Sequence, residues 1–318
     1  MRKLGVANNH VFVVSAGISP QRQRMDIRTT AARHAAGLIA AAAASFSLGV
    51  VTPAARIAYD SGVTATTLVA FRVAVATVVT AALVLSLRRS LAFTSLAKVP
   101  AMTTTAGMLM VAFGYMSSVL FIPVSLAALI FFLFPIIVLV HGVIVARRPP
   151  SMATVAAFVA AFTGLAMALG PSFETLDWRG IACALVAAVG ATLVMIAGAT
   201  AARRMDAFAL TFYTQAISLP VVLAALFSVG TVALPGDQVG WIGLAVATTG
   251  YIAGMVLLMV AVRLANPAPV SMINNLEPLV TLTVAAVLLG ERLATVQYMG
   301  GGLVLAAVFL AAREMAAE

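Results

Sequence analysis

Charged residues are scarce in this sequence. Only 9% of its 318 residues are Asp, Glu, Lys or Arg, whereas 63% are hydrophobic, and the mean hydropathy is +1.10. A water-soluble domain carries about 25% charged residues, because its surface must face water. The low charge therefore excludes an ordinary soluble domain and indicates a chain that lies largely within a bilayer.

Cysteine and histidine are scarce too. The single Cys183 excludes an internal disulfide and is typical of a small buried apolar residue. His10, His34 and His141 are scattered, which is not the pattern of a metal site. No Ser/His/Asp or Cys/His set and no nucleotide-binding loop is present. We therefore expect no cofactor and no enzymatic activity, with an intramembrane enzyme as the alternative.

Long uncharged stretches predict an all-α integral membrane protein, since about 20 residues of helix cross the hydrocarbon layer. The run 99–146 is long enough for two crossings, with a break at Pro123. Two further runs, 61–87 and 264–290, are each interrupted by one charge, Arg72 or Glu277. Ten transmembrane helices are predicted from these runs and from the remaining charge-free intervals, which are 34–55, 149–173, 180–202, 207–236, 238–262 and 293–312.

The basic residues predict the orientation. With a cytoplasmic N-terminus, 15 of the 19 Lys and Arg residues lie on the cytoplasmic side, and only Arg56, Arg179 and Arg292 lie outside. Both termini are therefore expected in the cytoplasm. Because the net charge of +9 reflects this topology, and no basic patch is interleaved with aromatic residues, no nucleic-acid partner is expected. Residues 1–34 are expected to form a disordered cytoplasmic extension.

The sequence contains an internal repeat. Residues 134–148 align with residues 277–291 at a constant offset of 143, and "PVSLA" at 123–127 corresponds to "PVSMI" at 269–273. We expect two five-helix repeats in one membrane domain, at 35–170 and 178–313. Because five is odd, the second repeat has inverted topology. Inverted repeats characterise secondary transporters, whose binding site lies near the midplane.

The second half, "LEPLVTLTVAAVLLGERLATVQYMGGGLVLAAVFL", resembles the EamA-type branch of the drug/metabolite transporter superfamily. In that branch a Glu-Pro within one helix is followed by a Gly-Glu turn and a last helix with glycines, and "FR" at 71–72 also matches. The resemblance implies a bacterial cytoplasmic-membrane transporter, most often an exporter of amino acids or other small metabolites. The first half departs from the pattern, with "FP" at 134–135 and "RR" at 147–148.

The polar stretch "NNLEPLVTL" marks the first candidate site. Pro278 has no N–H to donate to the carbonyl of Asn274, which is expected to be free. Asn274, Glu277 and Thr281 are spaced to share one helix face, and Asn275 adds a second amide. Two interpretations are open. Glu277 binds substrate or exchanges a proton, or it is a structural acid at a hinge.

Arg72 is the second candidate, with three interpretations: it extends to the headgroups, binds a substrate carboxylate, or pairs with Glu277. For an amino-acid substrate, Arg72 would bind the carboxylate and Glu277 the ammonium. His141 is a proton relay or a structural residue. The remaining candidates line a cavity or bond between helices; they are Tyr115, Tyr213, Gln215 and Tyr251.

These observations predict a secondary transporter that exports amino acids or related small metabolites by alternating access, with proton coupling left open. An importer or a facilitator is the alternative. Its partners would be a small-molecule substrate and the lipid bilayer. Either a monomer or a homodimer is compatible with the sequence.

Overall fold

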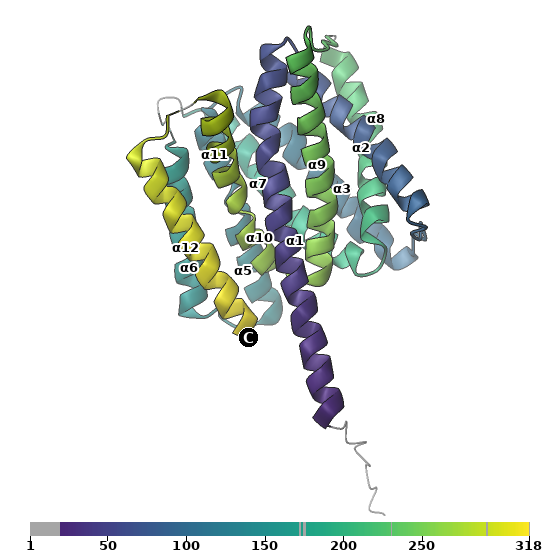
Figure 1. The fold of residues 1–318 in the computed structure, drawn as a ribbon, viewed down its shortest axis with the longest axis vertical. Coiled ribbons are helices and arrows are strands. Elements are labelled where there is room, and N and C mark those ends of the chain that lie inside the picture. The colour runs from purple at the N-terminus through teal and green to yellow at the C-terminus, as the bar shows by residue number, and fades with distance from the viewer. Residues whose placement is uncertain (1–19, 172, 174–175, 230, 291, 318) are drawn as a thin grey trace, which may run out of the picture.

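The chain is a bundle of long helices (Figure 1). The computed structural model describes residues 20–317, apart from 172, 174–175, 230 and 291, and all regular structure in this part is helical. The helices are α1 (Pro20–Asp60), α2 (Ala65–Ser86), α3 (Ser95–Ser118), α4 (Val124–Phe131), α5 (Phe134–Ala146), α6 (Met152–Leu169), α7 (Trp178–Ala202), α8 (Ala207–Val229), α9 (Gln238–Leu264), α10 (Pro267–Ile273), α11 (Leu276–Leu289) and α12 (Thr295–Ala317).

These helices make ten crossings. Nine spans in the described residues are long and apolar enough to cross a membrane, and Thr295–Ala311 adds a shorter apolar helix. Helices α4 and α5 form one crossing, and α10 and α11 form another. The prediction of ten membrane helices is confirmed. The start of α1 and the end of α12 lie at the same end of the bundle (Figure 1), which we call the terminal face; the other end is the opposite face.

The N-terminal extension differs from expectation where it is described. Residues 20–34 were predicted to be disordered, but they are the first part of the 41-residue helix α1. No Gly or Pro interrupts residues 21–36, and extending an existing helix avoids the cost of nucleating a new one. Residues 1–19 lie outside the described part.

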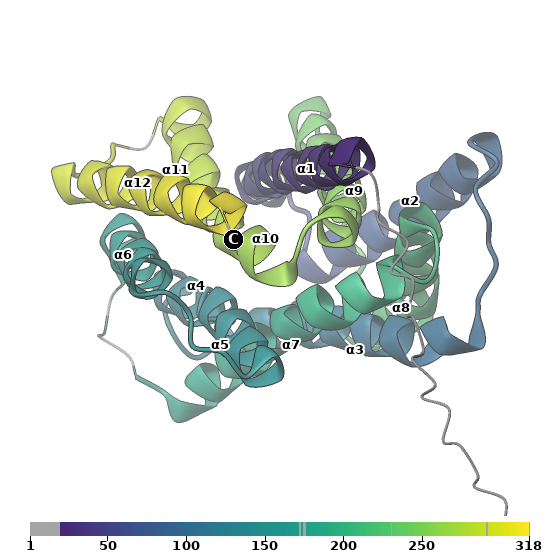
Figure 2. The ribbon, with the colours of Figure 1, turned by 90° about the horizontal axis from the view of Figure 1, so that it is seen from below.

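The packing follows the inverted repeat. Helix α1 packs most extensively against α9, and its counterpart α7 packs against α3 in the equivalent way. The remaining large contacts join counterparts directly, α2 with α8 and α6 with α12 (Figure 2). When the two halves are exchanged, the α1–α9 contact becomes the α7–α3 contact. The α2–α8 and α6–α12 contacts each become themselves. This confirms the fold of two inverted five-helix repeats.

Glycines allow the closest helix approaches. A Cβ on Gly107 of α3 would lie 2.6 Å from the carbonyl oxygen of Gly190 on α7, and one on Gly190 would lie 2.7 Å from that of Gly107. Between α6 and α12, Gly164 and Gly300 contact each other's backbone in the same way. Without side chains the backbones come close enough for dispersion contacts, which drive helix association in lipid.

Local sequence signals explain where several helices begin and end. The side chains of Ser151, Asp177 and Asp237 accept hydrogen bonds from backbone N–H groups at the starts of α6, α7 and α9. Such caps satisfy donors that have no partner within the helix. At the other end, Gly170 and Gly290 follow α6 and α11 with φ of 52° and 69°, a left-handed conformation that favours glycine.

Large apolar side chains cover much of the outside of the bundle. The exposed fraction reaches 69% for Val78, 75% for Val99 and 77% for Leu120. In water, so much exposed apolar surface would cause association, whereas in a bilayer it contacts lipid chains. The exterior therefore agrees with a multi-pass membrane protein.

Candidate functional site

The crossing formed by α10 and α11 is interrupted at Asn274 and Asn275. The carbonyl of Asn274 accepts a hydrogen bond from the backbone N–H of Glu277 at 3.0 Å. The expectation of a free carbonyl is therefore wrong, because the chain tightens into a turn in which a donor three residues ahead replaces the missing N–H of Pro278. The break is a defined turn and not a stretched helix.

Side chains hold this turn against α1. The hydroxyl of Ser45 lies 3.3 Å from the Asn274 Oδ1 atom and donates to it, while Thr281 donates to the carbonyl of Gly49 at 2.9 Å. The amide of Asn275 donates to the Met272 carbonyl at 3.0 Å, within its own turn. Asn274 and Thr281 thus share the helix face that packs on α1. Both asparagines are buried, and their hydrogen bonds fix the backbone of the break.

Glu277 directly follows this turn in α11. Its side chain is half-buried and makes no hydrogen bond or ion pair with the residues that the structure describes. Its carboxyl group is close enough to Tyr115 of α3 for an electrostatic interaction. Tyr115 in turn packs edge-on against Phe131 at the end of α4, with ring centres 5.7 Å apart. The carboxylate of the second half therefore lies near residues of the first half.

The corresponding break in the first half has different chemistry. Helix α4 ends at Phe131 and α5 begins at Phe134, so the interruption lies at the same place in the repeat. Three aromatic rings surround it, with centres 5.1 to 5.9 Å apart; they belong to Phe131, Phe132 and Phe134. Both crossings are broken, but only the second break carries an acid and two amides.

Arg72 belongs to a second polar cluster, between α2, α8 and α9. Its guanidinium carbon lies 4.5 Å from the ring centre of Tyr251, in cation–π geometry. The Tyr251 hydroxyl accepts a hydrogen bond from the Gln215 amide at 3.0 Å, and Gln215 is only 1% exposed. The Nε atom of Arg72 is buried and has no hydrogen-bond partner in the described residues, and Arg72 makes no ion pair with Glu277 there.

The comparisons with known proteins agree with this architecture. Residues 178–313 match the EamA-like transporter family. The second half of the chain is therefore similar to EamA-like transporters. An uncharacterized transporter of Archaeoglobus fulgidus is 26% identical over 201 residues, which are 63% of this chain and 72% of that protein.

A solved structure, titled only as the crystal structure of a protein, covers 86% of this chain and 98% of its own with a TM-score of 0.73. At 15% identity it supports the fold alone. The family match and the transporter relative together support a multi-pass membrane transporter of small molecules and not an enzyme.

Two of the predicted residues, Tyr213 and His141, lie apart from the Asn274–Glu277 turn and from the Arg72 cluster. The Tyr213 hydroxyl donates to the Leu91 carbonyl at 2.9 Å, and its ring packs on Phe93 in the α2–α3 connection near the terminal face. His141 is exposed on α5, and its side chain has no hydrogen bond or ion pair within the described residues. Within the described residues, neither side chain is hydrogen-bonded or ion-paired to Glu277 or Arg72.

Sequence reasoning missed the contribution of α1 to the turn at Asn274 and Asn275. Ser45 is fully buried and bonds to the Ile273 carbonyl as well as to Asn274. The available signal was a pair of serines, Ser45 and Ser47, in the alanine-rich run "AAAASFSLG", because a hydroxyl in hydrocarbon needs a partner. A partner 229 residues away cannot be identified from the local pattern.

Proposed function

We propose that the protein exports amino acids or related small metabolites by alternating access, moving one repeat against the other around the α10–α11 break. The observation that carries this proposal is the pair of interrupted crossings, of which the second holds a carboxylate that has no hydrogen bond or ion pair in the described residues and that interacts electrostatically with Tyr115 of the first half. Broken helices at membrane depth are tolerated where they are enclosed by protein or line a wet cavity. They are also where transporters bind their substrates.

The two membrane charges favour a substrate with both an anionic and a cationic group. Arg72 and Glu277 carry opposite charges but do not neutralise each other in the described structure. A guanidinium with an unpartnered buried N–H suits a carboxylate, which it binds in forked geometry. A carboxylate without a partner suits an ammonium group or a proton. An amino acid supplies both complementary groups.

Energy for export would come from a gradient across the bilayer. Exchange of a proton on Glu277 would couple transport to that gradient, since protonation removes a charge that is costly within the membrane. The arginine-rich terminal face supports a cytoplasmic location for both termini in a bacterial inner membrane.

Flux into proteoliposomes tests this function. A labelled amino-acid panel is offered to vesicles holding the wild type, Glu277→Gln or Glu277→Asp, with and without a pH gradient. We expect the gradient to stimulate wild-type flux, Glu277→Gln to lose that stimulation, and Glu277→Asp to retain part of it, because only the glutamine variant lacks an exchangeable proton.

Equal flux of wild type and Glu277→Gln, indifferent to the gradient, would show that Glu277 is a hinge residue and the protein a facilitator. No flux of any panel member would overturn the amino-acid assignment. Retention of the transported compound in intact cells that lack the protein would establish export, and reduced uptake would contradict it.

A further inference from the structure

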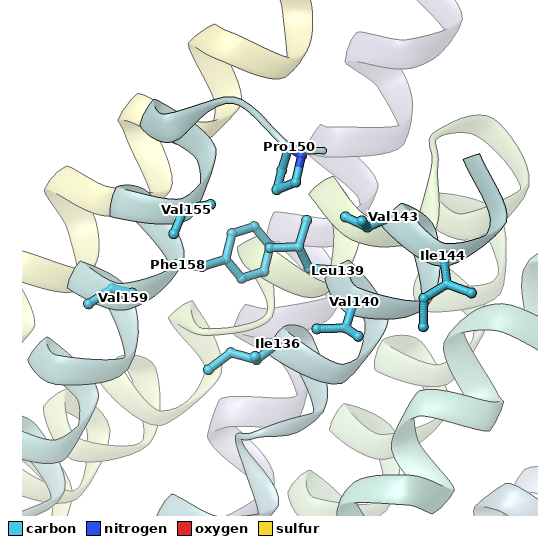
Figure 3. Close-up of a pocket in the computed structure, with 9 residues that line it drawn as sticks. All are labelled: Ile136, Leu139, Val140, Val143, Ile144, Pro150, Val155, Phe158 and Val159. Carbon is cyan, nitrogen blue, oxygen red and sulfur yellow. The ribbon is translucent and has the colours of Figure 1, made fainter. Parts of the chain in front are cut away.

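An apolar groove lies between α5 and α6, on the half of the bundle nearer the terminal face. Its volume is about 330 Å³, and all nine residues that line it are apolar. Figure 3 shows the ring of Phe158 between the two helices, with Leu139, Val140 and Val143 on the α5 side and Pro150 at one end. This groove is separate from both polar clusters described above.

The groove opens toward the bilayer. Its lining residues Val140, Ile144 and Val159 are 51%, 68% and 58% exposed. Helix α5 packs instead on α7 and α10, and α6 packs on α12. A polar solute would leave its hydrogen-bonding groups unsatisfied on such a surface, whereas a hydrocarbon chain would not. The lining and its position fit a lipid acyl chain.

Two arginines lie at the terminal-face end of this groove. Arg147 and Arg148 lie between Ile144 and Pro150, which both line it. Both arginines are exposed, and neither side chain has an ion pair or hydrogen bond within the described part of the chain. Their positive charge is therefore available to an anion at the membrane surface.

The backbone at Arg147 has a conformation that is unfavourable for a residue with a side chain. Arg147 ends α5 with a φ of 52°, in the left-handed region where glycine is favoured. The second repeat has Gly290, with a φ of 69°, at the corresponding position 143 residues later. The first repeat therefore carries a guanidinium at a backbone position where the second repeat has glycine.

We propose that the α5–α6 groove and the Arg147–Arg148 pair bind one anionic phospholipid of the surrounding bilayer. One acyl chain lies along the groove, and the phosphate is held by the two guanidinium groups, whose forked donors match phosphate oxygens. Basic residues next to a membrane helix attract anionic headgroups. The corresponding residues of the second repeat, Gly290 and Glu291, lack this charge, so the site belongs to the first repeat alone.

Native mass spectrometry of the purified full-length protein tests this site. The protein is titrated with dioleoyl phosphatidylglycerol or with dioleoyl phosphatidylcholine, which has the same chains but no net charge. We expect one phosphatidylglycerol to be retained preferentially. Its apparent affinity should fall roughly tenfold or more in Arg147→Gln/Arg148→Gln, because each basic residue contributes to headgroup attraction. Val140→Trp, which fills the groove, should also reduce retention.

Matched controls separate a built site from general surface charge. Arg88→Gln/Lys98→Gln removes two cations near the same face, and Val78→Trp adds a ring at an exposed α2 position; both should retain the lipid as wild type does. Glycerol 3-phosphate, a headgroup without chains, should not compete. The proposal is overturned if both phospholipids are retained equally, if the control cations matter as much, if Val140→Trp has no effect, or if glycerol 3-phosphate displaces the lipid.

Discussion

Arg72 and Glu277 both lie in membrane spans, but their surroundings differ. Arg72 lies over the ring of Tyr251, which gives its charge a partial partner without neutralising it. Glu277 has an electrostatic neighbour in Tyr115 but no hydrogen bond in the described structure. Because an idle charge at this depth is costly, two unneutralised charges on different helices favour a binding role over a structural one.

Replacing the Arg72 side chain tests its binding role. Arg72→Gln should weaken substrate binding by about 10- to 100-fold, since a hydrogen bond to a charged group contributes about 1.5–3 kcal/mol. The substrate is the panel amino acid that gives the largest wild-type flux. The half-saturating concentration of that substrate in proteoliposomes measures the effect.

Arg56→Gln is the control for this change. Arg56 also lies toward the opposite face, but it forms an exposed ion pair with Asp60 at 3.0 Å. This variant should transport like the wild type. An unchanged half-saturating concentration in Arg72→Gln would instead place Arg72 in a structural role.

At the scale of helices, the two broken crossings reach the same geometry by different chemistry. Aromatic packing encloses the break before Phe134, whereas hydrogen bonds of Asn274 and Asn275 hold the other. Pro278 indicated a disturbed helix in the second half, whereas the break before Phe134 was not predicted from the sequence. The ends of the short helices and the donor to the Asn274 carbonyl were not predictable, because they depend on how the chain tightens against α1.

Helix packing gives a second prediction, at two neighbouring glycines of α12. A Cβ on Gly300 would lie 2.5 Å from backbone atoms of Gly164 and Ala168, whereas one on Gly302 would meet nothing within 4 Å. Gly300→Val should therefore destabilise the protein by about 1–3 kcal/mol through overpacking. Gly302→Val should have little effect.

Thermal unfolding in detergent compares these two variants. Because both add the same side chain to the same helix, their difference isolates the contact with α6. Equal unfolding temperatures for Gly300→Val and Gly302→Val would contradict the close α6–α12 packing.

For the whole molecule, hydrogen bonds join the two repeats at both ends. At the opposite face, the Ser61 hydroxyl donates to Asp237 at 2.9 Å, and the Gly236 N–H donates to the Ser61 carbonyl at 3.0 Å. At the terminal face, the Arg204 side chain donates to the Leu96 carbonyl. Alternating access requires the contacts at one face to open while those at the other remain closed.

A covalent link at the opposite face should stop this movement. Ser61→Cys/Asp237→Cys, in a Cys183→Ala background, is expected to lose nearly all flux on oxidation and to recover it on reduction. The single variants are the controls. They separate the effect of the cross-link from the effect of replacing Asp237, which caps α9. Asp237 is also the charged partner of Ser61, because hydrogen bonds from the Gly240 N–H and the Ser61 hydroxyl hold the pKa of Asp237 below its ordinary value.

Flux in vesicles treated with oxidant and then reductant measures the effect. Transport that continues through the oxidised double variant, with the cross-link verified by mass, would show that this face does not need to open.

The sequence by itself determined the membrane location, the ten crossings and the inverted repeat. These follow from hydropathy, charge and an internal offset, which are local or periodic properties of the chain. It also identified Glu277 and Arg72, because a charge in an apolar run is conspicuous without any structure. The EamA-type motif at residues 276–302 agreed with the family match to the second half.

Only the tertiary structure decided which of these residues meet. Ser45 reaches Asn274 across 229 residues, and Arg72 lies over Tyr251 and forms no ion pair with Glu277 among the described residues. The left-handed Arg147 beside an apolar groove was equally invisible in the sequence. A membrane helix satisfies its backbone internally, so hydropathy fixes that it crosses the bilayer but not its rotation or its neighbours. Those depend on close packing between distant segments.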